Sequence, residues 1–196
     1  MKNFELLAPA GNFAKLKTAL YFGADAVYAG GKNFSLRALS DNFSDDEMRE
    51  AVLYTHERNK KIYVAVNVLA RGAELKKIDE YLGFLNDCGV DAVIVSDPGI
   101  ISLCRENHPS LQVHLSTQAS TTNRLAAKFW KNAGVTRVVL ARELSLAEVK
   151  DISDNCGIET EIFVHGAMCI SYSGRCLLSE YFTGRNPNAG ACAQCC

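Results

Sequence analysis

Three short stretches, FGADAVY (residues 22–28), CGVDAVIV (88–95) and AGVTRVVL (133–140), share one pattern. In each stretch a glycine follows a segment whose apolar residues have helical spacing, and an apolar, β-branched run begins two or three residues later. Glycine at this point is typical of the left-handed residue that ends a helix. The pattern therefore predicts a helix, a tight turn and a buried strand, three times over.

The same alternation extends along the chain on both sides of these stretches. We expect strands at residues 4–8, 26–29, 62–68, 92–96, 111–115, 137–140 and 161–164. We expect helices at residues 12–22, 44–58, 74–87, 98–106, 121–133 and 145–155, the second of which opens on the capping-box sequence SDDE. Apolar strands that alternate with helices are typical of a parallel sheet buried on both faces.

The expected elements are one strand short of a TIM-type (β/α)8 barrel, which has eight strands and typically about 250 residues. A doubly wound open sheet needs fewer strands and remains the alternative on periodicity alone. Because the chain of 196 residues reaches a cysteine-rich segment just after the seventh strand, we expect a barrel truncated after about seven strands. Residues 1–166 would form the incomplete barrel, and residues 167–196 a cysteine-rich, cluster-binding segment on its C-terminal rim.

Composition sets broad limits on the class of protein. A chain of 196 residues that is 48% hydrophobic can bury one substantial core without disulfides. No stretch approaches the roughly 20 apolar residues that span a bilayer, so we expect no membrane partner. The N-terminal sequence lacks a signal-peptide run, which favours a reducing, cytoplasmic location. The net charge of −1 neither favours nor excludes nucleic acid.

Polar residues recur where the expected strands end. In either architecture, ligands bind beyond the carboxyl ends of the strands. Asn67 interrupts the apolar run IYVAVNVLA, and His114 interrupts LQVHLST, whereas Arg142 and His165 follow the sixth and seventh strands. A buried polar side chain requires a partner or a ligand. These four residues are our catalytic candidates, although His114 taken alone is more typical of a hydrogen-bonded core histidine.

The eight cysteines fall into two groups. Cys88, Cys104 and Cys156 lie in or at the ends of expected helices among apolar residues, where a cysteine is typical of a small buried hydrophobe. The other five lie within residues 169–196, after the seventh strand. In a reducing compartment, clustered thiols more often hold metal or perform chemistry than form disulfides.

The spacing within the second group favours a cluster over a single ion. Six residues separate Cys169 from Cys176, and three separate Cys192 from Cys196. Zinc sites usually contain paired knuckles with two to four residues between the cysteines, and only the second pair fits that spacing. A wide loop of small residues suits an iron–sulfur cluster, with zinc as the alternative. Adjacent Cys195 and Cys196 are not expected to bind one centre together.

Long motifs of this sequence resemble those of a known family. EIFVHGAMCISYSGRCLLS (161–179) and GRNPNAGACAQCC (184–196) resemble the cysteine motif of the collagenase-like peptidase family U-32. ELLAPAGN, ALYFGADAVYAGG, YVAVNVLA, VSDPGII, VHLSTQAS and ARELSLAE also resemble that family, so the likeness spans essentially the whole chain. FSLRALSDNFSDDEM (34–48) is most similar to the branch that acts in tRNA wobble-uridine hydroxylation. Family members are usually about twice as long, so this chain looks like the N-terminal part of a longer protein.

The resemblance implies a function and a ligand set. Relatives act in prephenate-dependent or oxygen-independent hydroxylation of RNA bases or of the ubiquinone ring, and they carry a [4Fe–4S] cluster. Cys169, Cys176 and Cys192 match three cluster ligands, and the fourth would be Cys196 or a cysteine beyond this chain. The residue before the last family cysteine is usually proline, and here it is Cys195, which leaves open which terminal thiol binds.

We therefore expect an iron–sulfur enzyme that hydroxylates a tRNA uridine at its 5-position, with prephenate as a cosubstrate. Arg37 and Arg142 could bind a carboxylate donor, because guanidinium groups pair with carboxylates through two hydrogen bonds. A basic RNA-binding surface could comprise Arg124, Lys128, Lys131, Arg137 and Arg142. For the truncated chain alone we expect little or no activity, and a homo-oligomer or protein partner could support it.

Three alternative functions stay open at this point. The first is hydroxylation of 23S rRNA cytidine or of the ubiquinone ring. The second is a peptidase with Cys169 as nucleophile and His165 as base, because cysteine nucleophiles need a nearby base; the sequence contains no H-E-x-x-H and no G-x-S-x-G motif. The third is a non-catalytic cluster or zinc subunit of a larger assembly.

Overall fold

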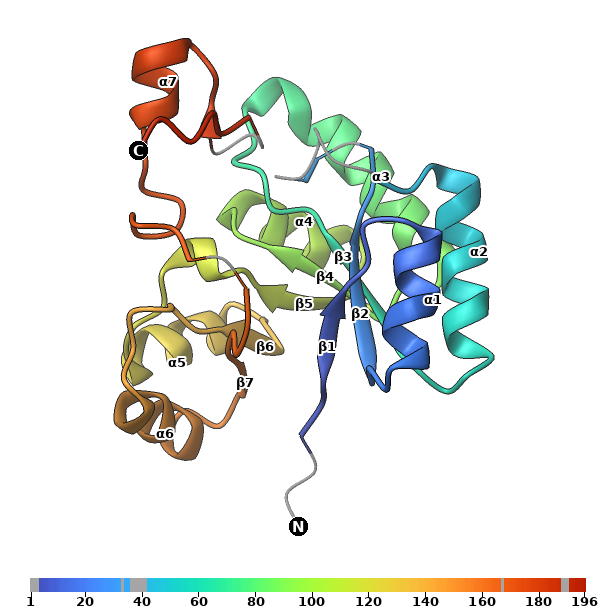
Figure 1. Cartoon of the computed structure of the whole chain (residues 1–196), viewed down its shortest axis with the longest axis horizontal. Coiled ribbons are helices and arrows are strands. Elements are labelled where there is room, and N and C mark those ends of the chain that lie inside the picture. Colours follow the sequence, from blue (N-terminus) through green and yellow to red (C-terminus); the bar gives the residue numbers. More distant parts are fainter. Residues whose placement is uncertain (1–3, 33, 36–41, 167, 188–190) are drawn as a thin grey trace.

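The computed structural model describes residues 4–32, 34–35, 42–166, 168–187 and 191–196. Within these ranges the chain alternates strands with helices (Figure 1). The strands are β1 (Leu7–Pro9), β2 (Ala26–Gly30), β3 (Lys61–Ala65), β4 (Ala92–Val95), β5 (Gln112–Leu115), β6 (Arg137–Val139) and β7 (Glu159–Glu161). The α-helices are α1 (Phe13–Tyr21), α2 (Asp45–His56), α3 (Leu75–Cys88), α4 (Pro98–Asn107), α5 (Arg124–Asn132), α6 (Leu146–Asn155) and α7 (Leu178–Thr183), with short 3-10 helices at η1 (Gly72–Glu74) and η2 (Thr117–Ala119).

The glycines of the three repeated stretches end helices as the sequence predicts. Gly23, Gly89 and Gly134 have φ values of 95°, 79° and 95°, in the left-handed region that glycine adopts without steric cost. The predicted capping box is also confirmed, because the Glu47 carboxylate accepts a hydrogen bond from the Ser44 backbone N–H at 2.8 Å. Helix ends in this chain are therefore set by local sequence.

The residue two positions after the glycine ties each new strand to its neighbour. The Asp25 carboxylate accepts a hydrogen bond from the Leu6 N–H at 3.0 Å, and the Asp91 carboxylate accepts one from the Ile62 N–H at 2.8 Å. The backbone N–H groups of the same two aspartates donate to Leu6 and Ile62. These paired hydrogen bonds extend the pairing of β1 with β2 and of β3 with β4 by one residue, just before β2 and β4 begin.

All neighbouring strands are parallel, and their order in the sheet is β1-β2-β3-β4-β5-β6-β7. A doubly wound sheet would reverse its strand order at a switch point, and this sheet does not. The sheet instead curls, with α1 to α6 around its outside and α7 apart from them beside the strand ends (Figure 1). This is the predicted TIM-type barrel with seven strands, open between β7 and β1 in the part of the chain that the structure describes.

Two buried layers hold the barrel together. The larger one lies between the sheet and its helices and includes Leu16, Met48, Leu82, Ile100 and Leu115. Each fully buried side chain of this size contributes roughly 1.5–3 kcal/mol relative to an exposed one. The smaller layer fills the inside of the curl with four buried residues, Ala26, Tyr63, Ala92 and Ile94.

An ionic network crosses the inside of the curl near the strand starts. Arg137 of β6 is only 9% exposed, and its guanidinium lies 2.7 Å from Glu5, 2.8 Å from Glu159 and 3.5 Å from Glu161. The Tyr63 hydroxyl donates to both carboxylate oxygens of Glu5, at 2.8 and 2.9 Å. The network joins the segment before β1 to β6 and β7 across the open side of the barrel.

Two predicted strands are displaced. β1 covers Leu7–Pro9 and not 4–8, and β7 covers Glu159–Glu161 and not 161–164. The glutamates of β7 lie in the strand because they pair with Arg137, whereas the apolar residues Ile162, Phe163 and Val164 follow β7 with their side chains exposed. Helix α7, within the cysteine-rich segment, was not predicted.

Candidate functional site

Polar side chains meet at the carboxyl ends of β3, β4 and β5. The Asn67 side-chain amide donates to the Gln118 side-chain oxygen at 2.7 Å, and the Ser116 hydroxyl donates to the same oxygen at 3.0 Å. The Ser96 hydroxyl donates to the Asn67 carbonyl at 3.0 Å. Asn67, predicted as a site residue, thus belongs to a hydrogen-bonded group on the rim, the edge of the barrel where its strands end.

His114 lies inside the barrel and not on the rim. It is 2% exposed, its ring meets the edge of Tyr63 at 4.6 Å between centroids, and its Nδ1 has no hydrogen-bond partner among the described residues. Burial, with Arg137 nearby, lowers the pKa of His114 to about 3. The imidazole is therefore neutral at physiological pH. It lies within β5, two residues before Ser116 and the polar group of the rim.

Arg142 and His165 come together at the ends of β6 and β7. Both line a pocket of about 270 Å³, together with apolar residues of the loop after β6, of α6 and of the segment after β7. The Arg142 guanidinium lies 4.7 Å from the centroid of the Phe163 ring. Such stacking fixes the direction of the guanidinium and keeps its positive charge. Arg37, the other predicted carboxylate ligand, lies outside the described residues.

The loop between Cys169 and Cys176 is anchored to the rim. The Ser120 hydroxyl, just after η2, donates to the Ser173 carbonyl at 3.0 Å. Gly174 has φ 72°, and a Cβ added there would lie 2.7 Å from the Gln118 carbonyl oxygen. Only glycine permits this close approach. The loop therefore contacts the residue that also binds Asn67 and Ser116.

A second anchor holds the terminal cysteines. The Ser179 hydroxyl, buried in α7, accepts a hydrogen bond from the Ala193 N–H at 2.9 Å and donates to the Ala191 carbonyl at 3.4 Å. The Cys192 sulfur accepts a hydrogen bond from the Gln194 N–H at 3.4 Å. Ser179 thus holds the backbone on both sides of Cys192, and α7 begins two residues after Cys176.

The thiols of the two cysteine groups differ in environment. Cys104 and Cys156 are buried and Cys88 is half-buried, which agrees with the prediction that they are small core residues. Burial raises the pKa of Cys104 to about 12 and also raises that of Cys88, so these thiols stay protonated. The five thiols of residues 169–196 are all free and exposed or half-buried.

The sulfur atoms of the cysteine-rich segment are suitable ligands for a metal ion or cluster. Thiolates bind iron–sulfur clusters and zinc, and five accessible thiols occur here on one anchored segment. Among the residues described, no three His, Cys, Asp or Glu side chains are gathered closely enough to hold a metal ion. In the same part of the chain, no hydrogen bond joins His165 to Cys169, the pair that a peptidase would use.

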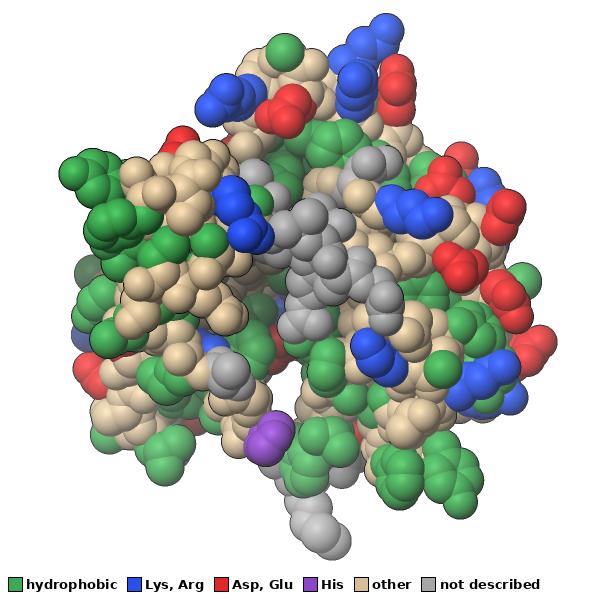
Figure 2. Space-filling view, turned by 45° about the horizontal axis from the view of Figure 1, so that its top comes forward, with side chains coloured by type: hydrophobic (Ala, Val, Ile, Leu, Met, Phe, Trp, Pro, Cys, Tyr) green, Lys and Arg blue, Asp and Glu red, His purple; other side chains and the backbone are tan. Residues whose placement is uncertain are grey.

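The surface around this segment is apolar. Hydrophobic side chains gather on the left of Figure 2, on the part of the molecule formed by the C-terminal segment and α7. The large exposed residues of this segment include Ile170, Tyr172, Leu177, Tyr181 and Phe182. No helix of the described structure has the length and apolarity that crossing a bilayer requires. Exposed apolar surface of this kind marks an interaction site in many proteins.

Sequence reasoning missed the two serine anchors. Ser120 and Ser179 are small polar residues in polar surroundings, and nothing in their spacing distinguishes them from other loop serines. It also missed the burial of Arg137, which cannot contribute to the predicted basic surface because Glu5, Glu159 and Glu161 surround it. A charged residue in the apolar run AGVTRVVL, with the glutamates of ETE in the next strand, was the available signal.

Comparison with known proteins places the chain in a family. The sequence profile of peptidase family U32 matches residues 11–196. The chain is 48% identical over 195 residues to the tRNA hydroxylation protein P1 of Bacillus subtilis, covering 100% of this chain and 46% of that protein. It is 40% identical over 192 residues to the 23S rRNA 5-hydroxycytidine synthase of Escherichia coli, covering 98% of this chain and 29% of that protein.

A solved U32 peptidase structure has the same fold, with a TM-score of 0.70 at 18% identity over 82% of this chain and 68% of that one. The chain spans less than half the length of the two curated relatives named above. The family match over residues 11–196, the relative at 48% identity and the shared barrel agree. This chain therefore belongs to peptidase family U32.

Proposed function

We propose that this chain is part of a cytoplasmic RNA-modifying enzyme that hydroxylates a tRNA uridine at its 5-position, with prephenate as cosubstrate. A [4Fe–4S] cluster would be held by Cys169, Cys176, Cys192 and Cys196. The proposal is supported by its relatives, which include tRNA hydroxylation proteins and an rRNA hydroxycytidine synthase. Hydroxylation of RNA is common to their names.

One structural observation carries the proposal. The loop between Cys169 and Cys176 contacts the rim through Ser120 and Gly174. Ligands of a TIM-type barrel bind at this rim. A group held by thiols of this loop would therefore be close to a base bound over the strand ends.

The residues of the rim supply complementary binding groups. The amides of Asn67 and Gln118 offer the donors and acceptors that the edge of a uracil base needs. Arg142, held against Phe163, offers a guanidinium to a carboxylate cosubstrate. A bound cluster would supply electron transfer or a Lewis-acidic iron. The chain's own residues would orient the base and the carboxylate beside it.

Metal analysis tests the cofactor. We would purify the chain without oxygen and measure iron, sulfide and zinc in the wild type, in Cys169→Ala and in Cys88→Ala. Cys88 is the matched control, because it is a half-buried thiol at the end of α3, opposite the rim. We expect iron and sulfide in the wild type and the control and a loss in Cys169→Ala. Stoichiometric zinc without iron would exclude the cluster.

The same preparation identifies the fourth ligand. Cys195→Ala and Cys196→Ala differ by one position in an exposed segment, so a loss of iron in only one of them assigns the ligand. If neither variant loses iron, the fourth thiolate does not come from this pair.

Nucleoside analysis tests the substrate. The tRNA and 23S rRNA of cells with and without the full-length gene would be digested and their nucleosides compared by mass spectrometry. We expect loss of a hydroxylated uridine from tRNA. Loss confined to a hydroxylated cytidine in rRNA would assign the chain to the other branch. Peptide cleavage by metal-free protein that His165→Ala abolishes would instead support the peptidase.

A further inference from the structure

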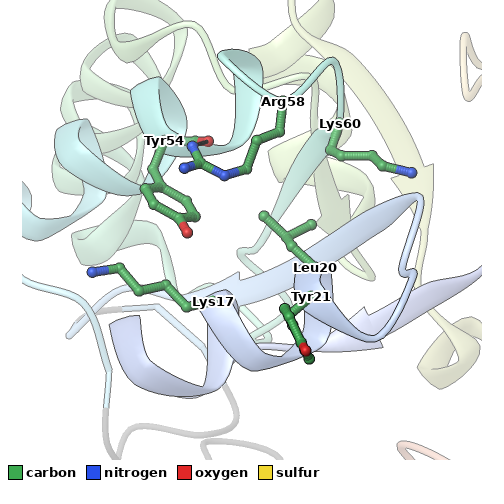
Figure 3. Close-up of a pocket in the computed structure, with 6 residues that line it drawn as sticks. All are labelled: Lys17, Leu20, Tyr21, Tyr54, Arg58 and Lys60. Atoms are coloured by element: carbon green, nitrogen blue, oxygen red, sulfur yellow. Dashed lines mark hydrogen bonds between the residues drawn. The ribbon is translucent and has the colours of Figure 1, made fainter.

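A cationic and aromatic pocket lies on the outside of the barrel, far from the cysteine segment. It has a volume of about 220 Å³ between the C-terminal ends of α1 and α2. Figure 3 shows its lining, which consists of Lys17, Leu20, Tyr21, Tyr54, Arg58 and Lys60. Because helices of a β/α barrel run back toward the strand starts, this pocket is at the end of the barrel opposite the rim.

An aromatic ring holds two of the three cations. The Arg58 guanidinium lies 3.4 Å from the centroid of the Tyr54 ring, and the Lys17 ammonium lies 5.3 Å from the same centroid (Figure 3). Arg58 also donates to the Tyr54 carbonyl at 2.8 Å, which fixes the guanidinium further. A cation held by a ring keeps its full charge, whereas a carboxylate would neutralise it.

Nearby carboxylates offset only part of this charge. Lys60 pairs with Asp25 at 3.0 Å, and Arg58 lies 3.5 Å from Glu57. Lys17 has no carboxylate partner among the described residues, and its ammonium lies over the rings of Phe13 and Tyr54. Of the described residues that line the pocket, none is acidic. The pocket is therefore suited to an anion, with Lys17 as its uncompensated cation.

Exposed aromatic rings adjoin the cations. Tyr21, which lines the pocket, is 84% exposed, and Phe22 beside it is 78% exposed, with their ring centroids 5.2 Å apart. Rings this exposed contribute nothing to the core. Cations that track a phosphate backbone, next to aromatic rings on which bases or riboses stack, are the combination that binds RNA without sequence preference.

We propose that this pocket is a second RNA contact, in which Lys17 and Arg58 bind a backbone phosphate and Tyr21 packs against the adjoining nucleotide. Its volume is below the roughly 300–1,000 Å³ of pockets that enclose a whole small ligand, so it suits one part of a larger partner. The inference rests on the proposed function, since it concerns the same RNA substrate. It is an alternative to the basic surface predicted around α5, where Arg137 is buried and Arg124 lies 3.8 Å from Asp151.

RNA binding by charge-reversal variants tests this contact. We would measure the Kd of the wild-type chain for bacterial tRNA over a range of salt concentrations, and repeat it for Lys17→Glu. Lys76→Glu on α3 is the matched control, because it makes the same charge change at an exposed lysine away from the pocket. Lys128→Glu on α5 tests the competing surface. Lys17→Arg keeps the charge and serves as the rescue variant.

We expect Lys17→Glu to weaken binding by about tenfold and to reduce the slope of log Kd against log salt by about 1, as loss of one phosphate contact does. Lys17→Arg, Lys76→Glu and Lys128→Glu should bind as the wild type does. Far-UV circular dichroism of Lys17→Glu should be unchanged, because its side chain packs on the surface. Equal binding by Lys17→Glu and Lys76→Glu would overturn the proposal, as would a loss in Lys128→Glu alone.

Competitors distinguish the sources of the anion. Polyglutamate that displaces tRNA as well as unlabelled tRNA does would indicate an acidic protein partner and overturn the RNA contact. Inorganic phosphate or uridine monophosphate that does so would indicate a small-anion site and overturn it likewise. The assay requires neither iron nor hydroxylation, so a missing cluster or an unchanged nucleoside profile would refute the proposed function without affecting this result.

Discussion

A single histidine inside the barrel links its packing to the pH dependence of stability. The His114 ring packs against Tyr63, and the charges of Arg137, Lys61 and Glu5 act on it, of which the first two are positive. Burial removes water from the ring, and the cations disfavour a further positive charge. Its pKa in the folded protein is about 3, against about 6.5 in an unfolded chain. Folding therefore requires the neutral ring.

We predict that His114 makes the folded state less stable in acid. Between about pH 6.5 and pH 3 the unfolded chain binds a proton at this position that the folded chain excludes, so stability falls as pH falls, by up to about 1.4 kcal/mol per pH unit. Above that window the histidine has no effect on the slope. Urea unfolding of the wild type and His114→Phe between about pH 7 and pH 4.5 should show the steeper loss in the wild type.

His165→Phe is the matched control, because the same substitution is made at an exposed histidine. Its pH profile should follow that of the wild type. Identical slopes for the wild type and His114→Phe would contradict the prediction, whatever their absolute stabilities.

At the scale of helices and strands, local signals predicted the wall of the barrel well. Gly23, Gly89 and Gly134 adopt the left-handed conformation that the sequence indicated, because an αL position strongly selects glycine. β7 was displaced because its strand residues are the glutamates that pair with Arg137. A pattern of apolar residues cannot reveal an ion pair between neighbouring strands.

We predict that Gly89→Ala destabilises the protein by about 1–2 kcal/mol, the cost of placing a Cβ in the left-handed region. No atom lies within 4 Å of a Cβ added at Gly89, so the effect comes from the backbone alone. Gly72→Ala is the control, since its added Cβ is equally free and its φ is not positive. Urea unfolding should separate the two variants, and an equal effect on both would refute this explanation.

For the whole molecule, the candidate site was predicted less completely than the fold. Asn67 and Gly174 of the cysteine loop both approach Gln118 on the rim. The anchors at Ser120 and Ser179 depend on contacts between residues 53 and 12 positions apart, which no local pattern encodes. In the described sheet, β1 and β7 each pair with one neighbour only. Unpaired strands of this kind tend to associate with other strands.

We predict that the isolated chain self-associates through this open side. Val164 is an exposed apolar residue just after β7, and Val164→Lys should shift the sedimentation profile toward monomer because charge opposes edge-to-edge pairing. Leu53→Lys, an equally apolar exposed position on α2, should leave association unchanged. A wild-type chain that stays monomeric across all concentrations would contradict the prediction.

The hydrogen bond from Arg137 to Glu5 has a consequence for the kinetics of folding. It joins residues 132 positions apart, and closing so long a loop carries an entropic cost that must be met before the contact stabilises anything. Each helix–turn–strand unit, by contrast, forms through contacts between residues close in sequence, so the loops that it closes are short. The sheet should thus acquire its strands early and its curvature late, with the contact between the segment before β1 and Arg137 of β6 as the slow step.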